Sequence, residues 1–85
     1  PTLEANVLLA LGVLESKSVG DKIGLTLLLE GEKLASDKPV FWYYIGRLYA
    51  YKSEWDKARD YLQRVIDFDD GYLRESARQY LPGKP

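Results

Sequence analysis

The chain has 85 residues, of which 46% are hydrophobic and 29% are charged, and its formal net charge at pH 7 is −1. A chain of this length forms one small domain, so its size favours a binding or assembly module over a two-domain enzyme. The sequence contains no Cys and no His, which excludes thiol nucleophiles, imidazole bases and disulfides, and also zinc sites that use these ligands. We therefore expect no enzyme activity and no metal or cofactor.

The small net charge also bears on which kinds of molecule the chain can bind. A duplex nucleic-acid binder has to neutralise many phosphates, and a net charge of −1 argues against that function. No apolar run approaches the roughly 18 residues of a membrane span, so membrane insertion is not expected. The first residues also lack a basic region followed by an apolar core, so no targeting segment is predicted and the cytoplasm is the default location.

Hydrophobic residues at helical spacing predict five short helices separated by turn residues. In chain order they cover residues 3–14, 21–35, 40–51, 53–68 and 72–81. Ser36 or Asp37 is the candidate N-cap of the third helix, with Pro39 in its first turn. Ser53 and Asp56 resemble a capping box that opens the fourth helix.

The fourth predicted helix carries two pairs of opposite charges at favourable spacing, Asp56 with Arg59 and Asp60 with Arg64. After it, Asp69, Asp70 and Gly71 supply turn and capping residues for the fifth helix, which Pro82 and Gly83 end. All eleven aromatic residues and all five arginines fall between Phe41 and Tyr80, whereas residues 1–40 are rich in Leu.

The sequence matches itself at an offset of 34 residues. The matching positions have apolar or small side chains in both copies; the pairs are Leu8 with Trp42, Leu11 with Ile45, Gly12 with Gly46, Gly24 with Ala58, Leu28 with Leu62, and Gly31 with Val65. Small residues at the repeated sites indicate close helix packing, with Gly46 opposite Ala58 and Gly12 opposite Gly24.

These residues resemble the tetratricopeptide repeat (TPR) family. The family signature is met by Trp42, Ile45, Gly46, Tyr49, Ala58 and Leu62, while Asp70 stands where Pro is usual. The first copy departs further, because Leu8 replaces the Trp and Glu15 the Tyr. The resemblance implies one all-α domain over residues 1–85, a right-handed superhelix of two helical hairpins (5–38 and 39–72) and a capping helix (73–81).

In that family one flank of the first helix of each repeat lines a concave groove for a partner peptide or protein. The positions here that match this flank or lie at its edge are Asn6, Leu9, Val13, Tyr43, Tyr44, Arg47, Tyr51, Arg74 and Arg78. Aromatic rings with arginines suit a partner segment that carries a carboxylate. The alternative is that Tyr43 and Tyr51 pack against neighbouring helices and that the arginines are solvated.

Some TPR proteins hold the C-terminal carboxylate of a chaperone tail with Lys, Asn, Asn, Lys and Arg. Arg74 and Arg78 agree in type with the last two places, but Leu9, Val13 and Tyr44 occupy the other three. The chain is therefore not expected to bind a chaperone tail.

Leu25 and Leu29 align with Arg59 and Gln63, which are predicted to face solvent. They would form an outer apolar stripe that a partner or a second copy covers. The alternative is that this stripe joins the core. Two classes of function remain open, a module that binds a peptide or protein in its groove and a module whose repeats serve to form a homodimer or larger assembly. A third, an enzyme fragment whose active site lies in another domain, would be recognised by the length of the parent gene.

Overall fold

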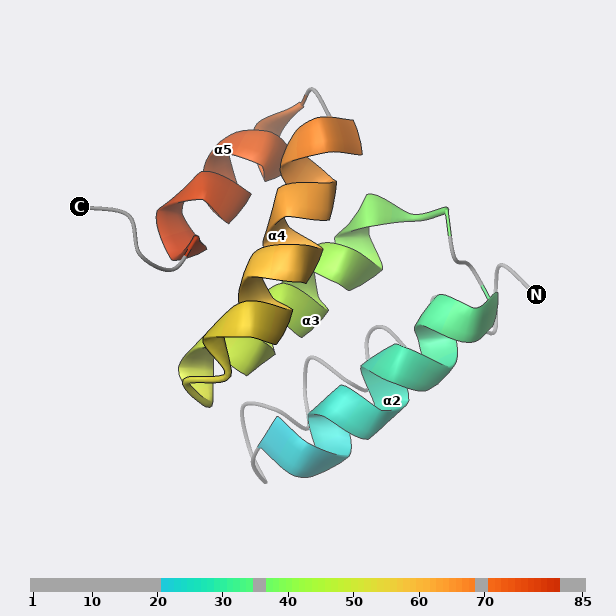
Figure 1. Cartoon of the computed structure of the whole chain (residues 1–85). Helices are drawn as coiled ribbons and strands as arrows, with labels where there is room; N and C mark the ends of the chain where they lie inside the picture. Colours follow the sequence, from blue (N-terminus) through green and yellow to red (C-terminus); the bar gives the residue numbers. More distant parts are fainter. Residues whose placement is uncertain (1–20, 35–36, 69–70, 82–85) are drawn as a thin grey trace.

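In the computed structural model, residues 21–34, 37–68 and 71–81 are described, and all their regular structure is helical (Figure 1). The four helices are α2 (Asp21–Leu34), α3 (Pro39–Tyr51), α4 (Trp55–Phe68) and α5 (Tyr72–Tyr80). They confirm the all-α class and four of the predicted helices to within two residues at each end. The predicted first helix, over residues 3–14, lies outside the described residues.

Helices α3 and α4 form an antiparallel pair at the centre of the described part of the chain, with α2 and α5 on either side (Figure 1). The pair is close because Gly46 has no side chain. A Cβ atom at Gly46 would lie 2.8 Å from Cγ and Cδ2 of Leu62 and 3.3 Å from its backbone N. The predicted need for a small residue at Gly46 is therefore confirmed, and the neighbour that presses on it is Leu62, one helical turn beyond Ala58.

The turn between α3 and α4 differs from the predicted capping box. Ser53 has a positive φ of 62°, its N–H donates to Ala50 O at 3.0 Å, and the N–H of Glu54 donates to Tyr49 O at 2.9 Å. These two bonds form a Schellman motif, which ends α3. Helix α4 then begins at Trp55. Ser53 therefore serves the end of the preceding helix rather than the start of the next one.

The N-cap of α3 also differs from the prediction. The cap residue is Lys38, with φ −102° and ψ 107°, and it makes no side-chain cap hydrogen bond within the described residues. Pro39 follows in the first turn of the helix. Because a residue that precedes proline is disfavoured in the helical region, the helix starts at the proline and Asp37 lies too early to cap it. Ser36 lies outside the described residues.

Helix α2 packs against α3 and reproduces the burial pattern of α4 at the 34-residue offset. All six aligned positions of the two helices are buried: Gly24 with Ala58, Leu28 with Leu62, and Gly31 with Val65. A Cβ atom at Gly31 would collide with the ring of Phe41. The offset read from the sequence thus corresponds to one packing surface that occurs on two helices.

The predicted outer stripe is wrong. Leu25 is 8% exposed and lies in the same hydrophobic cluster as Leu28, Phe41 and Ile45, and Leu29 is half-buried against that cluster. Their aligned partners Arg59 and Gln63 are exposed. Helix α2 therefore buries a wider face than α4 does, and the alternative, that the leucines join the core, is the one that agrees with the structure.

Helix α5 packs against both α4 and α3. Ala77 is its fully buried residue, and it shares a cluster with Trp42, Tyr43, Leu62 and Val65. Because a small residue stands at this contact, α5 can approach α3 closely enough for the side chains of the two helices to meet.

Candidate partner-binding surface on α3 and α5

Three tyrosines surround the side chain of Arg47. Its guanidinium carbon lies 4.5 Å from the ring centroid of Tyr80, 5.4 Å from that of Tyr43 and 5.7 Å from that of Tyr44. Helix α3 supplies Tyr43, Tyr44 and Arg47, and the last residue of α5 supplies Tyr80. Each distance is within the range at which a cation is attracted to the negative face of an aromatic ring. We call these four residues the tyrosine–arginine cluster.

The rings of the cluster also pack on one another. Tyr43 meets Tyr44 edge to face with centroids 5.1 Å apart, and meets Tyr80 edge to face at 6.2 Å. Tyr43 is 7% exposed and Tyr80 is 39% exposed, while Tyr44 and Arg47 are half-buried. The cluster therefore has a base in the core and an outer part that solvent or a partner can reach.

Arg47 differs from the other arginines in what it contacts. Arg59 pairs with Asp56 at 3.4 Å, Arg64 with Asp60 at 3.1 Å and Glu32 at 3.4 Å, and Arg78 with Glu75 at 3.2 Å. Two of these pairs, Asp56 with Arg59 and Asp60 with Arg64, were predicted from the spacing and are confirmed. Within residues 21–34, 37–68 and 71–81, no carboxylate forms an ion pair with Arg47.

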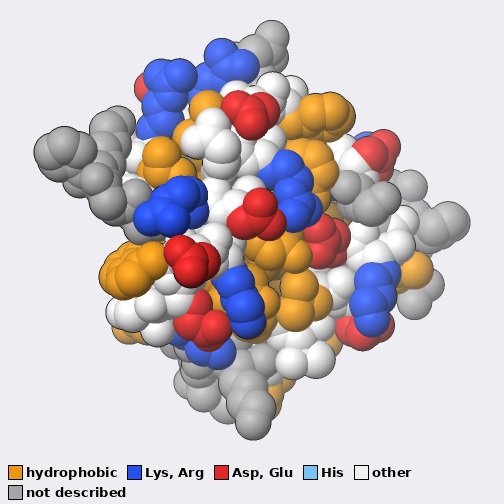
Figure 2. All heavy atoms as spheres, viewed as in Figure 1, with side chains coloured by type: hydrophobic (Ala, Val, Ile, Leu, Met, Phe, Trp, Pro, Cys, Tyr) orange, Lys and Arg blue, Asp and Glu red, His pale blue; other side chains and the backbone are white. Residues whose placement is uncertain are grey.

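The face of the molecule that carries α4 shows the more usual arrangement. Figure 2 shows basic and acidic side chains interspersed over this face, with apolar side chains between them. Because opposite charges alternate there, this face has little net attraction for a charged partner.

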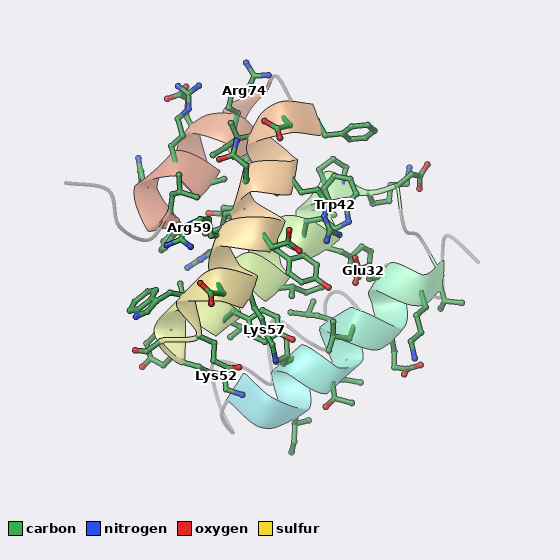
Figure 3. All side chains as sticks on the ribbon, in the orientation of Figure 1. Glu32, Trp42, Lys52, Lys57, Arg59 and Arg74 are labelled. Atoms are coloured by element: carbon green, nitrogen blue, oxygen red, sulfur yellow. The ribbon has the colours of Figure 1, made fainter. Side chains whose placement is uncertain are left out.

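The two predicted arginines of α5 contact groups other than the four cluster residues. Arg74 donates from Nε to the carbonyl oxygen of Ile66 at 3.0 Å, near the C-terminal end of α4 (Figure 3). The last carbonyls of a helix lack intrahelical partners and attract cations, which explains this placement. Arg78 pairs with Glu75 on its own helix. Arg74 therefore joins α5 to α4, and its place in the groove stays a prediction.

Of the remaining predicted groove positions, one lies in the described residues and three do not. Tyr51 is 85% exposed, one helical turn beyond Arg47 on α3. The alternative that it packs against a neighbouring helix is thus wrong for Tyr51, whereas for Tyr43, which is buried in a cluster with Ala77 of α5, that alternative is confirmed. Asn6, Leu9 and Val13 lie outside the described residues.

Tyr80 was missed by the sequence reasoning. It stands 34 residues after Gly46, so the repeat register assigns it to a helix-packing position where the earlier copies have glycine. The structure places its ring over Arg47 instead. The aromatic residues of α3 are the signal that could have suggested this contact. A tyrosine side chain is long enough to reach aromatic residues on a neighbouring helix, even from a position that the repeat assigns to helix packing.

A second polar cluster joins α2, α3 and α4. Glu32 of α2 accepts a hydrogen bond from the Tyr61 hydroxyl at 3.1 Å and pairs with Arg64 at 3.4 Å, both on α4. The guanidinium of Arg64 lies 5.6 Å from the ring of Trp42 and 4.6 Å from that of Tyr61. Figure 3 shows Glu32 and Trp42, which belong to α2 and α3, on the same side of α4. These contacts join α2 to α4, the two helices that align at the 34-residue offset.

Burial of the Tyr61 hydroxyl, followed by the negative charge of Glu32 and the hydrogen bond to it, raises the pKa of Tyr61 to about 12. The positive charge of Arg64 acts in the opposite direction. A phenol with so high a pKa stays neutral and is a poor proton donor to substrates at neutral pH. The contacts of Glu32 with Tyr61 and Arg64 therefore join α2 to α4.

No family model, curated protein or solved structure matches the chain. The resemblance to the TPR family thus rests on the residues of the chain. In the described ranges, no helix combines the length and apolar content needed to span a bilayer. Those ranges also hold no group of three or more acidic side chains placed to bind a metal ion.

Proposed function

We propose that the chain is a protein-interaction module built as a TPR-like helical stack, and that it binds a partner peptide on the surface formed by α3 and α5. The observation that carries the proposal is the tyrosine–arginine cluster, in which a half-buried cation without a carboxylate partner in the described residues lies one turn from the exposed ring of Tyr51. Aromatic and arginine side chains are enriched where proteins bind one another.

The stack itself is proposed from the aligned burial of α2 and α4. In a helical repeat stack each repeat contacts its neighbours along the chain. Helix α4 packs against both α3 and α5, and α2 packs against α3, so neighbouring segments are in contact, which supports the proposal. An assembly that uses Leu25 and Leu29 as an outer contact has lost its basis, because Leu25 lies in the core.

A selection from a library of random 12-residue peptides, displayed against the full chain, tests the proposal. We expect the chain to enrich a family of related peptides. Tyr51→Ala should weaken their binding by about tenfold, as for a contact residue at the centre of an interface. Tyr72→Ala is the matched control, because Tyr72 is similarly exposed, at 79%, but lies at the other end of α5.

The Tyr72→Ala variant should bind the selected peptides as the unmodified chain does. If no peptide family is enriched, or if Tyr51→Ala and Tyr72→Ala bind equally well, the α3–α5 surface is not the binding site and the proposed function is wrong.

A further inference from the structure

We infer that Arg47 is the receptor for one carboxylate group of the bound peptide, with the rings of Tyr43 and Tyr80 fixing the guanidinium. This inference rests on the proposed function, since it names the chemistry of the partner at the same surface. Three properties of Arg47 support it. The charge of Arg47 has no carboxylate partner in the described residues, its N–H groups are available, and its surroundings balance one negative charge but not two.

The charge of Arg47 is not balanced within the described residues. A half-buried guanidinium loses part of its hydration, and proteins compensate for such a loss with a carboxylate partner. Arg59, Arg64 and Arg78 have such partners at 3.1 to 3.4 Å. Arg47 has three ring faces instead, which makes it the arginine among these four at which an added carboxylate gains most.

The rings leave the N–H groups of Arg47 available. A cation–π contact uses the negative face of the ring and supplies no oxygen or nitrogen lone pair to the guanidinium. The five N–H donors of arginine form a planar fork that matches the two oxygens of a carboxylate. The tyrosines therefore hold the side chain in place without occupying its fork, so little conformational entropy is lost when the carboxylate binds.

A single negative charge fits this site better than a phosphate dianion. Arg47 contributes one positive charge, and the three tyrosines turn electron-rich ring faces toward it. Of the two arginines on α5, Arg78 pairs with Glu75 and Arg74 donates to the carbonyl of Ile66. A phosphate dianion would need a second cation to balance it, whereas a carboxylate does not.

The test follows the Nε–Hε signal of Arg47 by nuclear magnetic resonance in the full chain, assigned by its loss in Arg47→Gln. Four probes are titrated: N-acetylphenylalanine, which presents a C-terminal carboxylate, N-acetylglutamate α-amide, which presents a side-chain carboxylate, N-acetylphenylalanine amide, which has no charge, and inorganic phosphate. We expect a saturable shift with at least one of the two carboxylates and none with the uncharged amide. The carboxylate that binds more tightly identifies which of the two sources the site prefers.

Affinity for the better carboxylate should fall by about tenfold or more in Arg47→Gln, as expected for the loss of a charge-assisted hydrogen bond. Arg59→Gln is the matched control, because it removes the same charge from the exposed face of α4 and should leave the affinity within about twofold. Arg47→Lys, which keeps the charge but lacks the planar fork, should bind more weakly than the unmodified chain.

The inference is overturned if neither carboxylate gives a saturable shift of the Arg47 signal, if phosphate binds more tightly than both, or if Arg59→Gln weakens binding as much as Arg47→Gln. Because the Arg47 signal is observed in the unmodified chain, a folding defect of the variants cannot hide this result. If the selected peptides bind equally well after their carboxylates are removed, the inference is overturned and the proposed function stays intact. A failure of the peptide selection, together with a carboxylate shift at Arg47, would overturn the proposed function alone.

Discussion

Gly46 and Leu62 show how one missing side chain controls the packing of two helices. At an open helical site, replacing glycine by alanine stabilises a protein by about 0.5 to 1 kcal/mol, because glycine loses more backbone entropy on folding. At Gly46 the added Cβ would approach the fully buried Leu62 to 2.8 Å and its backbone N to 3.3 Å. Backbone atoms within a helix cannot move aside independently, so we expect the steric effect to exceed the gain in entropy.

Gly46→Ala should therefore destabilise the chain in spite of the better helix propensity, and Gly46→Val should do so more strongly, by about 1 to 3 kcal/mol. For a domain of this size, each 1 kcal/mol lowers Tm by about 4 to 8 °C. Thermal unfolding followed by circular dichroism measures the shift. Leu62→Val in the same chain should restore part of the loss, and strictly additive effects of the two substitutions would contradict the contact.

Tyr61 gives a pH dependence whose direction is set by its burial and by Glu32. The pKa of Tyr61 in the folded chain is about 12, above the ordinary value of 10.0. Folding therefore favours the neutral phenol, and this contribution to stability is fully present below pH 10 and is lost as the pH rises from about 10 to about 12.

We expect the urea midpoint of the unmodified chain to fall between pH 10 and pH 12 more steeply than that of Tyr61→Phe. At pH 7, Tyr61→Phe should cost about 1 kcal/mol, because the hydrogen bond to Glu32 is lost. The difference between the two proteins is the quantity to measure, because it isolates the contribution of Tyr61. Tyr51→Phe is the control, since Tyr51 is 85% exposed, and equal slopes for all three proteins would contradict the role of Tyr61.

At the scale of the element, the turn between α3 and α4 places a non-glycine residue where glycine is usual. Ser53 is the C′ residue of the Schellman motif that ends α3 and has φ 62°. An L-residue in this left-handed conformation is less stable than glycine by roughly 1 kcal/mol. The serine side chain makes no hydrogen bond within the described residues that would compensate.

Ser53→Gly should accordingly stabilise the chain by about 0.5 to 1 kcal/mol and raise Tm by a few degrees. Ser53→Ala should give no such gain, because alanine keeps the Cβ atom. Had Ser53 capped α4, Ser53→Gly would have been neutral or destabilising and Ser53→Ala would have cost about 1 kcal/mol. Thermal unfolding of the two variants distinguishes the Schellman motif from the capping box.

Helix α5 is positioned by contacts at both of its ends. Near its start, Arg74 donates to a carbonyl of α4, and at its end Tyr80 packs against Tyr43 and Arg47 of α3. Between them Ala77 is fully buried. An element of nine residues is too short to be a stable helix by itself, so these tertiary contacts account for its order and bring Tyr80 to the candidate surface.

At the scale of the whole molecule, the 34-residue offset describes how the helices pack. The helix positions and the small or apolar residues at the contacts were predictable, since they depend on local periodicity and on residue size. Gly24, Leu28 and Gly31 are buried as their counterparts in α4 are. The offset could not predict that Leu25 is buried, because aligned positions share a register but not the same neighbours.

The sequence predicted the candidate surface only in part. Tyr43, Tyr44 and Arg47 were expected together because they lie within about one turn of a single helix. Tyr80 was missed and the contact of Arg74 with α4 was not foreseen, because both depend on how α5 lies against α3 and α4. No pattern within α5 specifies that arrangement.

By itself, the sequence determined the all-α class, the bounds of four helices to within two residues, and the glycine on which the α3–α4 contact depends. These features follow from interactions between residues close in the chain and from side-chain volume. The tertiary structure alone decided that Leu25 lies in the core, that Arg74 joins α5 to α4, and that Tyr80 completes the cluster around Arg47. Each of these depends on the relative placement of helices, which is set by the packing of the whole core.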